Sequence, residues 1–90
     1  MKFHYTIVVK GKVQGVFYRA SARQKAESLS ITGFAQNKPD GSVLIEAEGD
    51  EVSLKEFVSW CWKGPANAEV KEVLVNEKES TGYLSFSVKR

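Results

Sequence analysis

Apolar residues recur in this chain at two different spacings, either at every second position or at every third or fourth position. The order of these two patterns along the chain restricts its fold more than any other feature. Residues 3–10, FHYTIVVK, place an apolar side chain at every second position, which predicts a strand with one buried face. The residues on that face are Phe3, Tyr5, Ile7 and Val9. From residue 19 to residue 29 the apolar spacing becomes three or four residues, which predicts a helix. Its core face consists of Tyr18, Ala22, Ala26 and Leu29.

The same two spacings recur in the rest of the chain. Further strands are predicted at residues 33–38, 43–48, 70–75 and 84–88. A second helix is predicted between Asp50, a suitable N-cap residue, and the helix-stopping pair Gly64-Pro65. The resulting order is β-α-β-β-α-β with an extra strand at the end. We therefore expect an α+β, ferredoxin-like split βαβ sandwich, with a four- or five-stranded antiparallel sheet and two helices on one face.

Length, charge and cysteine content restrict the class of protein. Ninety residues predict one domain, residues 1–90. The formal net charge of +2 is too small to indicate a nucleic-acid partner, but it suits a small anionic ligand. Cys61 is the only cysteine, so no intramolecular disulfide can form, and we expect a cytoplasmic protein. We find no signal peptide and no stretch of membrane-spanning length, and we expect a monomer.

The stretch VKGKVQGVFYR, residues 9–19, joins the first strand to the first helix. A helix N-terminus exposes unpaired N–H groups and the positive end of the helix dipole, and glycines allow a preceding loop to curl around an anion. Arg19 adds a planar fork of donors that matches phosphate oxygens. The corner therefore suits a phosphate, although Gly11 and Gly15 would equally suit a plain turn. Neither of the common nucleotide-binding loops, GxxxxGK[ST] or GxGxxG, is present.

Two long motifs resemble those of the acylphosphatase family. The first, G-x-V-Q-G-V-x-x-R, is residues 11–19. The second, G-aromatic-x-x-N-x-x-x-G-x-V followed by a later glycine, is formed by Gly33, Phe34, Asn37, Gly41, Val43 and Gly49. A later segment, Gly64-Pro65 with Ala68-x-Val70, is also similar to the family pattern. The resemblance extends over nearly the whole chain.

The resemblance implies hydrolysis of acyl phosphates to a carboxylate and inorganic phosphate, without metal or cofactor. It assigns the phosphate to Arg19 and the loop amides, and the orientation of the attacking water to Asn37. The backbone of the loop is Gly15, Val16, Phe17, Tyr18 and Arg19. We expect Gln14 to support this loop through its amide. Inorganic phosphate or sulfate is then expected to bind at the same place as an inhibitor.

The chemistry is consistent with this sparse set of residues. The leaving carboxylate has a conjugate acid with a pKa of about 4, so it departs without a general acid. With one histidine and one cysteine, the chain offers no metal cluster and no nucleophile–base pair. We expect His4 to have no catalytic role and Cys61 to belong to the core. Glu46 and Glu48 share a strand face that we expect to be solvated, although a metal or acid–base pair is an alternative.

Two positions differ from the family pattern. Tyr18 stands where phenylalanine or methionine is more frequent, and its hydroxyl needs a partner or solvent. Ser30 stands where glycine is frequent, which predicts a left-handed residue after the first helix. Trp60 and Trp62 flank the core stripe of the second helix, and they either shield its edges or form a partner surface.

Non-catalytic functions are the alternatives. RNA-recognition modules have the same order of elements, with aromatic residues on the third strand of the sheet. Here that strand reads SVLIEAE, without an aromatic residue and with two acids. A regulatory module without turnover is a further alternative, against which the presence of both Arg19 and Asn37 argues.

Overall fold

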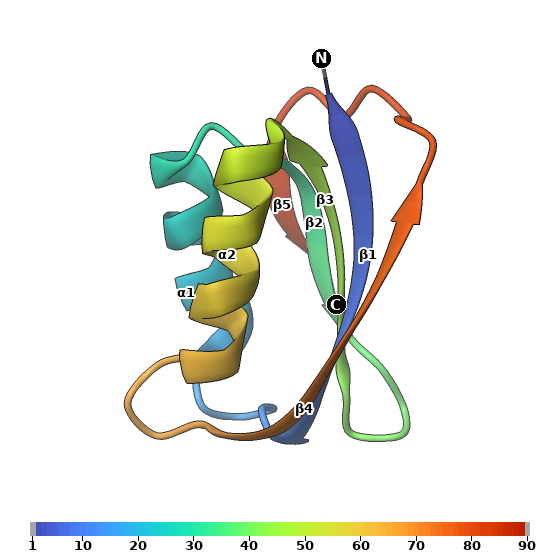
Figure 1. Cartoon of the computed structure of the whole chain (residues 1–90). Helices are drawn as coiled ribbons and strands as arrows, with labels where there is room; N and C mark the ends of the chain where they lie inside the picture. Colours follow the sequence, from blue (N-terminus) through green and yellow to red (C-terminus); the bar gives the residue numbers. More distant parts are fainter. Residues whose placement is uncertain (1, 90) are drawn as a thin grey trace.

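A sheet forms one layer of the molecule and two helices form the other, as the computed structural model shows for residues 2–89 (Figure 1). The elements are β1 (Phe3–Lys12), α1 (Tyr18–Ser28), β2 (Thr32–Asn37), β3 (Val43–Gly49), α2 (Glu51–Lys63), β4 (Glu69–Lys78) and β5 (Phe86–Lys89). Both helices cover the same face of the sheet, which confirms the predicted ferredoxin-like arrangement. Met1 and Arg90, the ends of the predicted domain, lie outside the described residues.

The sheet has five strands in the order β4-β1-β3-β2-β5. β3 lies between β1 and β2 and is antiparallel to both, with Ile45 opposite Ile7 on one side and opposite Ala35 on the other. The last strand, β5, pairs with β2 in parallel, so the expectation of an antiparallel sheet is wrong for this pair. The reason is the connection 79–85, which crosses the end of the sheet from β4 at one edge to β5 at the other. β5 starts at the end where β4 stops, and it therefore runs in the direction of β2.

The core lies between the helices and the helix-facing side of the sheet. Alternate residues of β1 and β3 point into it because successive strand side chains face opposite sides. Its fully buried members include Ile7, Val9, Val43, Ile45, Ala47, Leu54 and Phe57. Burial of each leucine, isoleucine or phenylalanine contributes roughly 1.5–3 kcal/mol. On α1 the core positions Ala22 and Ala26 are small, which lets the helix pack close to the sheet.

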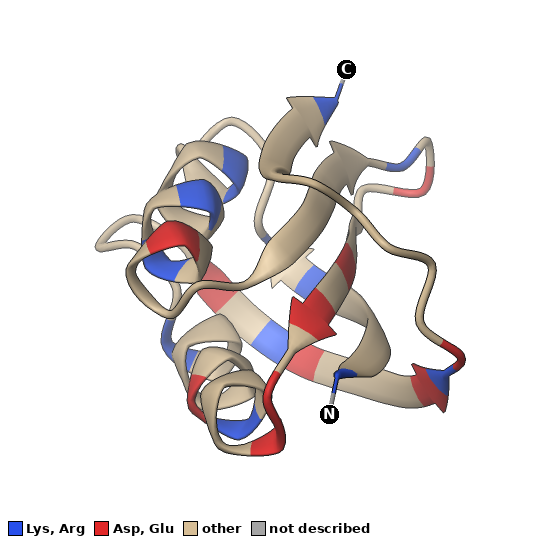
Figure 2. Cartoon of the chain, turned by 90° about the horizontal axis from the view of Figure 1, so that it is seen from above, with Lys and Arg blue, Asp and Glu red and all other residues tan. Residues whose placement is uncertain are grey.

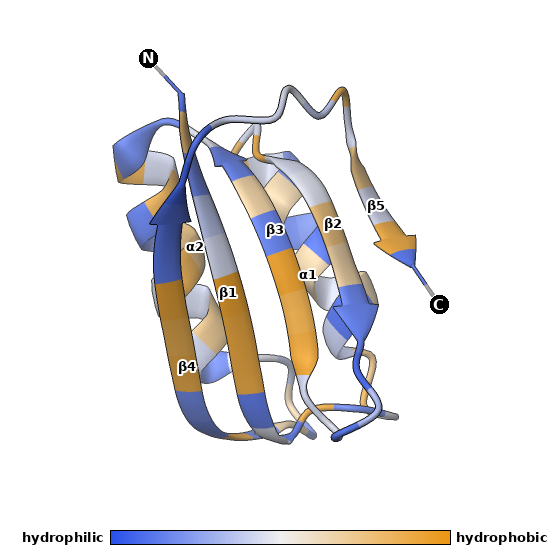
Figure 3. Cartoon of the chain, turned by 90° about the vertical axis from the view of Figure 1, so that its right-hand side faces the viewer, coloured by the Kyte–Doolittle hydropathy of each residue, from blue (hydrophilic) through white to orange (hydrophobic). Residues whose placement is uncertain are grey.

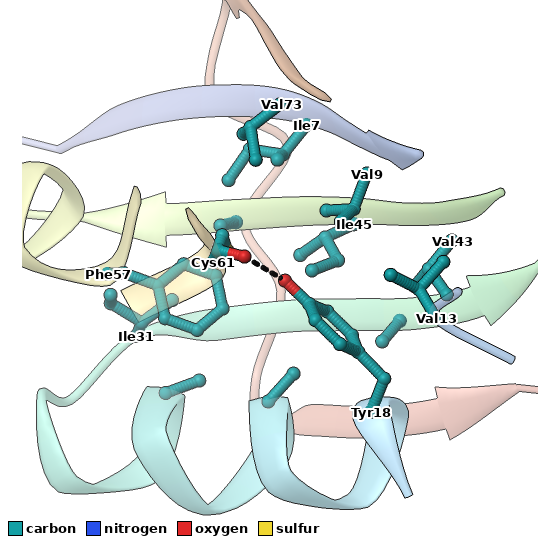
Figure 4. Close-up of a cluster of buried hydrophobic side chains, with 14 of the residues drawn as sticks. Ile7, Val9, Val13, Tyr18, Ile31, Val43, Ile45, Phe57, Cys61 and Val73 are labelled. Atoms are coloured by element: carbon teal, nitrogen blue, oxygen red, sulfur yellow. Dashed lines mark hydrogen bonds between the residues drawn. The ribbon is translucent and has the colours of Figure 1, made fainter. Parts of the chain in front are cut away.

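Tyr18 joins the first turn of α1 to the last turn of α2. Its ring is buried in the core, and its hydroxyl donates a hydrogen bond of 2.7 Å to the carbonyl oxygen of Cys61 (Figure 4). This bond supplies the partner that the sequence requires. Cys61 is fully buried, which confirms that it belongs to the core. Burial raises the pKa of Tyr18, and it raises the pKa of the Cys61 thiol to about 12. Trp60 packs against the Tyr18 ring with centroids 5.3 Å apart, whereas Trp62 is half exposed.

The C-terminal end of α1 and the N-terminal end of α2 differ in how they are capped. Ser30 has a φ of 57°, which confirms the left-handed residue expected there. The N–H groups of Ser30 and Ile31 donate to the carbonyl oxygens of Glu27 and Ala26, the pattern of a Schellman motif. Asp50 occupies the N-cap of α2, but its side chain makes no capping hydrogen bond. Within residues 2–89, neither helix combines the length and apolar character needed to cross a membrane.

Candidate active site

The loop between β1 and α1 has an unusual backbone. Gly15 has a φ of 74° and Phe17 a φ of 64°, while Val16 between them is not in the positive-φ region. A loop that combines left-handed residues with other turn conformations can aim successive N–H groups at one point, an arrangement known as an anion-binding nest. For a phenylalanine the left-handed conformation costs roughly 1–2 kcal/mol. Strain of this kind is concentrated at functional sites, which favours a ligand-binding role for the loop.

The N-terminus of α1 adds further donors. The helix begins at Tyr18, and its first hydrogen bond is donated by the N–H of Ser21 to the carbonyl oxygen of Phe17. The N–H groups of the first turn therefore have no acceptor within the helix. No side chain caps them, and the first turn carries no acidic residue. The loop and the helix dipole together offer an uncompensated positive end to an anion.

A cavity of about 290 Å³ lies beside this loop. Its wall consists of Val13, Gly15, Phe17, Tyr18, Arg19, Ala20, Asn37 and Val88. The cavity thus brings Asn37 of β2 together with four residues of the predicted phosphate loop. Val16 and Gln14 do not line it, and the side chain of Val16 is buried in the core.

Arg19 is oriented by the last strand. One of its terminal nitrogens donates a hydrogen bond of 2.6 Å to the carbonyl oxygen of Lys89 in β5. Val88, the neighbouring residue, lies opposite Ala35 of β2 and reaches the cavity wall. Sequence reasoning missed the contribution of β5 to the site. No local signal could have revealed it, because the site gains Val88 and Lys89 only through the pairing of β5 with β2.

Asn37 carries an unsatisfied polar atom. Its Oδ1 is buried, and it has no hydrogen-bond partner within residues 2–89. A buried acceptor without a donor costs about 1–3 kcal/mol, so such an atom needs an explanation. Asn37 lines the cavity together with Arg19. Because its amide oxygen has no partner to lose, the side chain can turn toward a group that enters the cavity.

Gln14 connects the loop to the hairpin that carries Asn37. Its Nε2 donates to the carbonyl oxygens of Lys38 and Ser42, at 2.8 and 2.9 Å. The hairpin is closed next to these contacts by a bond of 2.8 Å from the N–H of Lys38 to the carbonyl oxygen of Ser42. The amide of Gln14 thus spans the two segments that provide the predicted site residues.

Comparison with known proteins identifies the family. A family model described as Acylphosphatase matches residues 5–88. The chain belongs to the acylphosphatase family. An acylphosphatase from Marinobacter nauticus is 51% identical over 75 residues, which cover 83% of this chain and 82% of the relative. An acylphosphatase from a Synechococcus species is 43% identical over 89 residues, 99% of either chain. The structure of an acylphosphatase from Coxiella burnetii has a TM-score of 0.95 at 39% identity, covering 98% of this chain and 93% of that one.

Gly11, the first glycine of the acylphosphatase motif, has a structural role. It lies inside β1, where the register with β4 shifts between Lys10 and Gly11. A Cβ atom at this position would lie 2.2 Å from the carbonyl oxygen of Glu69, so only glycine allows the two strands to approach. Of the two glycines between residues 9 and 19, Gly15 therefore belongs to the loop and Gly11 to the sheet.

The other face of the sheet carries a buried polar cluster. Figure 3 shows that neither helix covers this face of the sheet. The acidic residues of β3 are drawn in red in Figure 2. The expectation that Glu48 is solvated is wrong, because its side chain is fully buried, as is His4 beside it. The His4 ring contacts both carboxylates, with Nδ1 2.8 Å from Glu48 and Nε2 2.5 Å from Glu46. The connection 79–85 covers Glu48, which accepts hydrogen bonds from three of its backbone N–H groups.

The cluster of His4, Glu46 and Glu48 also bears on two alternatives to an acylphosphatase site, an RNA-binding sheet and a metal site. Burial of Glu48 opposes its ionisation, but the N–H groups of Thr81 and Gly82 outweigh it and lower the pKa of the carboxyl to about 2. The carboxylates of Glu46 and Glu48 stand where an RNA-recognition module would carry aromatic side chains, and they would repel phosphates. Among residues 2–89, no group of three histidine, cysteine, aspartate or glutamate side chains is placed to hold a metal ion.

Proposed function

We propose that the protein hydrolyses acyl phosphates to a carboxylate and inorganic phosphate, in the cavity between the N-terminus of α1 and Asn37. Membership of the acylphosphatase family supports the reaction. The observation that carries the assignment of the site is the cavity that Asn37 and Arg19 line together, where the amide oxygen of Asn37 has no partner among residues 2–89. One side of the cavity offers donors for an anion and the other offers the side-chain amide of Asn37 for a water.

The phosphoryl group binds to the loop. The nest at Gly15 to Phe17 and the first-turn N–H groups of α1 surround its oxygens, and Arg19 holds two of them with its planar fork. Arginine has five N–H donors, so its contact with the Lys89 carbonyl leaves donors for the phosphate. These groups stabilise the negative charge of the equatorial oxygens in the transition state. Inorganic phosphate and sulfate are competitive inhibitors in this arrangement.

Asn37 orients the attacking water. Its side-chain amide turns toward the cavity and hydrogen-bonds the water, which directs the water oxygen at phosphorus, in line with the bond that breaks. A neutral amide holds the water without repelling the anionic substrate, as a carboxylate would. The water oxygen forms a bond to phosphorus, and the bond from phosphorus to the acyl oxygen breaks. The carboxylate leaves with the electron pair, and the proton of the water passes to a phosphate oxygen.

Hydrolysis of acetyl phosphate in water enriched in heavy oxygen tests this function. We expect release of inorganic phosphate in the presence of a strong chelator, with the heavy oxygen found in the phosphate. Label in the acetate would mean that water attacks the acyl carbon, which contradicts the role given to Asn37. Activity that disappears with the chelator and returns with magnesium would contradict the metal-independent mechanism. A heat-denatured sample gives the background of spontaneous hydrolysis.

A further inference from the structure

Part of the cavity wall is apolar and has no role in holding phosphate. Phe17 is 79% exposed and Val88 is 37% exposed, and both residues line the cavity. An aromatic ring that is exposed, on a residue held in a left-handed conformation, contributes little to the core. The loop backbone needs Phe17 only for its N–H group, which any residue would provide. The exposed ring is therefore explained better by a ligand than by packing.

The geometry of the site places the rest of the substrate against this wall. The phosphoryl group lies at the nest and the first turn of α1, so the acyl group extends into the remainder of the cavity. Phe17 is the last residue of the nest, and Val88 approaches from β5, next to the carbonyl that holds Arg19. The acyl group therefore lies between an aromatic ring and a branched aliphatic side chain, both of which offer apolar surface.

The charges around the cavity favour the same kind of acyl group. Among the described residues that line the cavity, Arg19 is the only charged one, and it serves the phosphate. Lys89, the neighbour of Val88 in sequence, places its ammonium group over the ring of Phe34, 3.9 Å from the ring centre. Phe34 faces Glu46 and Ser87 on the open face of the sheet, away from the helices. A carboxylate on the acyl group would thus lose water without gaining a cationic partner among the residues that line the cavity, apart from Arg19.

We propose that Phe17 and Val88 form an acyl-binding wall, and that the protein prefers acyl phosphates with an apolar, aromatic or branched acyl group to those with a second carboxylate. This inference rests on the proposed function of the same cavity. Val88 is the residue that determines this specificity without taking part in phosphate binding. The preference is expressed in kcat/KM, because the contacts exist in the transition state as well as in the bound substrate.

Steady-state kinetics with benzoyl, acetyl and succinyl phosphate tests the wall. For each variant, the ratio of kcat/KM between two substrates is compared with the same ratio for the parent protein. The intrinsic reactivity of each compound cancels in this comparison. Val88→Lys places a cation at the wall, and we expect the ratio of benzoyl to succinyl phosphate to fall about ten-fold or more. Val88→Thr keeps the branched shape and the strand propensity, and we expect the ratio of benzoyl to acetyl phosphate to fall about three-fold.

Val75→Lys is the matched control, because Val75 is a similarly exposed valine, 40% against 37%, on the opposite edge strand β4. It should leave both ratios unchanged. If the protein hydrolyses all three substrates and neither Val88 variant changes the ratios, the acyl-binding wall is wrong and the hydrolysis stands. A parent protein that prefers succinyl phosphate also overturns the wall. If none of the three is hydrolysed, the proposed function fails, and this inference with it.

Discussion

The guanidinium group of Arg19 is held by the carbonyl oxygen of Lys89, 2.6 Å away and 70 residues later in the chain. The partner is a neutral carbonyl, and no carboxylate of residues 2–89 forms an ion pair with Arg19. The side chain is thereby oriented while its positive charge stays uncompensated. This arrangement suits an anion-binding arginine, since a carboxylate partner would compete with the substrate for the guanidinium group.

Arg19→Lys tests the need for a planar fork of donors. Lysine keeps the charge but offers a compact ammonium group that cannot hold two phosphate oxygens in a fixed geometry. We expect kcat/KM to fall by about 100-fold or more and the inhibition constant of phosphate to rise. Arg23→Lys is the control, because Arg23 lies on the same helix and pairs with Glu27 at the surface. Near-normal kinetics in Arg19→Lys would show that the charge alone is sufficient.

Asn37→Ala separates the orientation of water from phosphate binding. We expect kcat to fall by about 100-fold, while the inhibition constant of phosphate changes less than about three-fold. The variant should also gain about 1 kcal/mol in the free energy of unfolding, because it removes a buried acceptor without a partner. Both quantities come from steady-state kinetics and urea titrations. Loss of phosphate binding as severe as in Arg19→Lys would make Asn37 a binding residue instead.

Asn37→Asp is the charged counterpart of that variant. The carboxylate has the same shape, but it repels the phosphate dianion and lacks the amide donor. We expect weak turnover and weak phosphate binding at neutral pH, with binding partly restored as the new carboxylate is protonated in acid. Phosphate titrations across pH measure this recovery. Binding as tight as that of the parent at neutral pH would place the side chain of residue 37 away from the phosphate.

Ser30→Gly is expected to stabilise the protein without altering activity. Ser30 has a φ of 57°, a conformation that glycine adopts freely and that costs other residues roughly 1 kcal/mol. We expect a gain of about that size in urea denaturation, with unchanged kcat and KM. Ser28→Gly provides the contrast, because Ser28 is the last residue of α1 and glycine there lowers helix stability. Destabilisation by Ser30→Gly would mean that the hydroxyl of Ser30 has a role in the fold.

Glu48→Gln tests the buried cluster under the connection 79–85. The pKa of Glu48 is lowered from 4.5 to about 2, so its stabilising effect is complete above pH 4.5 and is lost as the pH falls toward 2. At neutral pH we expect Glu48→Gln to lose about 2–4 kcal/mol, because glutamine cannot replace the charge that faces His4 and three N–H groups. The variant should also show a weaker dependence of stability on pH between 4.5 and 2. Glu79→Gln, an exposed acid in the same connection, should behave like the parent.

Much of the fold could be predicted because it depends on local spacing and local backbone chemistry. Alternation in residues 3–10 and in β3 marks strands that bury one face, and the core positions of α2 recur at helical spacing. The left-handed conformation of Ser30 could be predicted because the family usually has glycine at this position, and the turn at Gly15 because glycine adopts positive φ freely. The resemblance to the acylphosphatase family pointed to Arg19 and Asn37, and local spacing predicted the element at whose end each of them stands.

The sequence by itself thus determined the elements, the side chains each one buries, and the loop and strand end that meet at the cavity. The tertiary structure alone decided the parallel pairing of β5 with β2, the contact of Lys89 with Arg19, and Val88 in the cavity wall. It also decided the burial of Glu48, which its own strand pattern does not distinguish from a solvated acid. All of these depend on the path of the connection 79–85 across the sheet. That path is stabilised by hydrogen bonds to a residue more than thirty positions earlier, and no local pattern contains such long-range contacts.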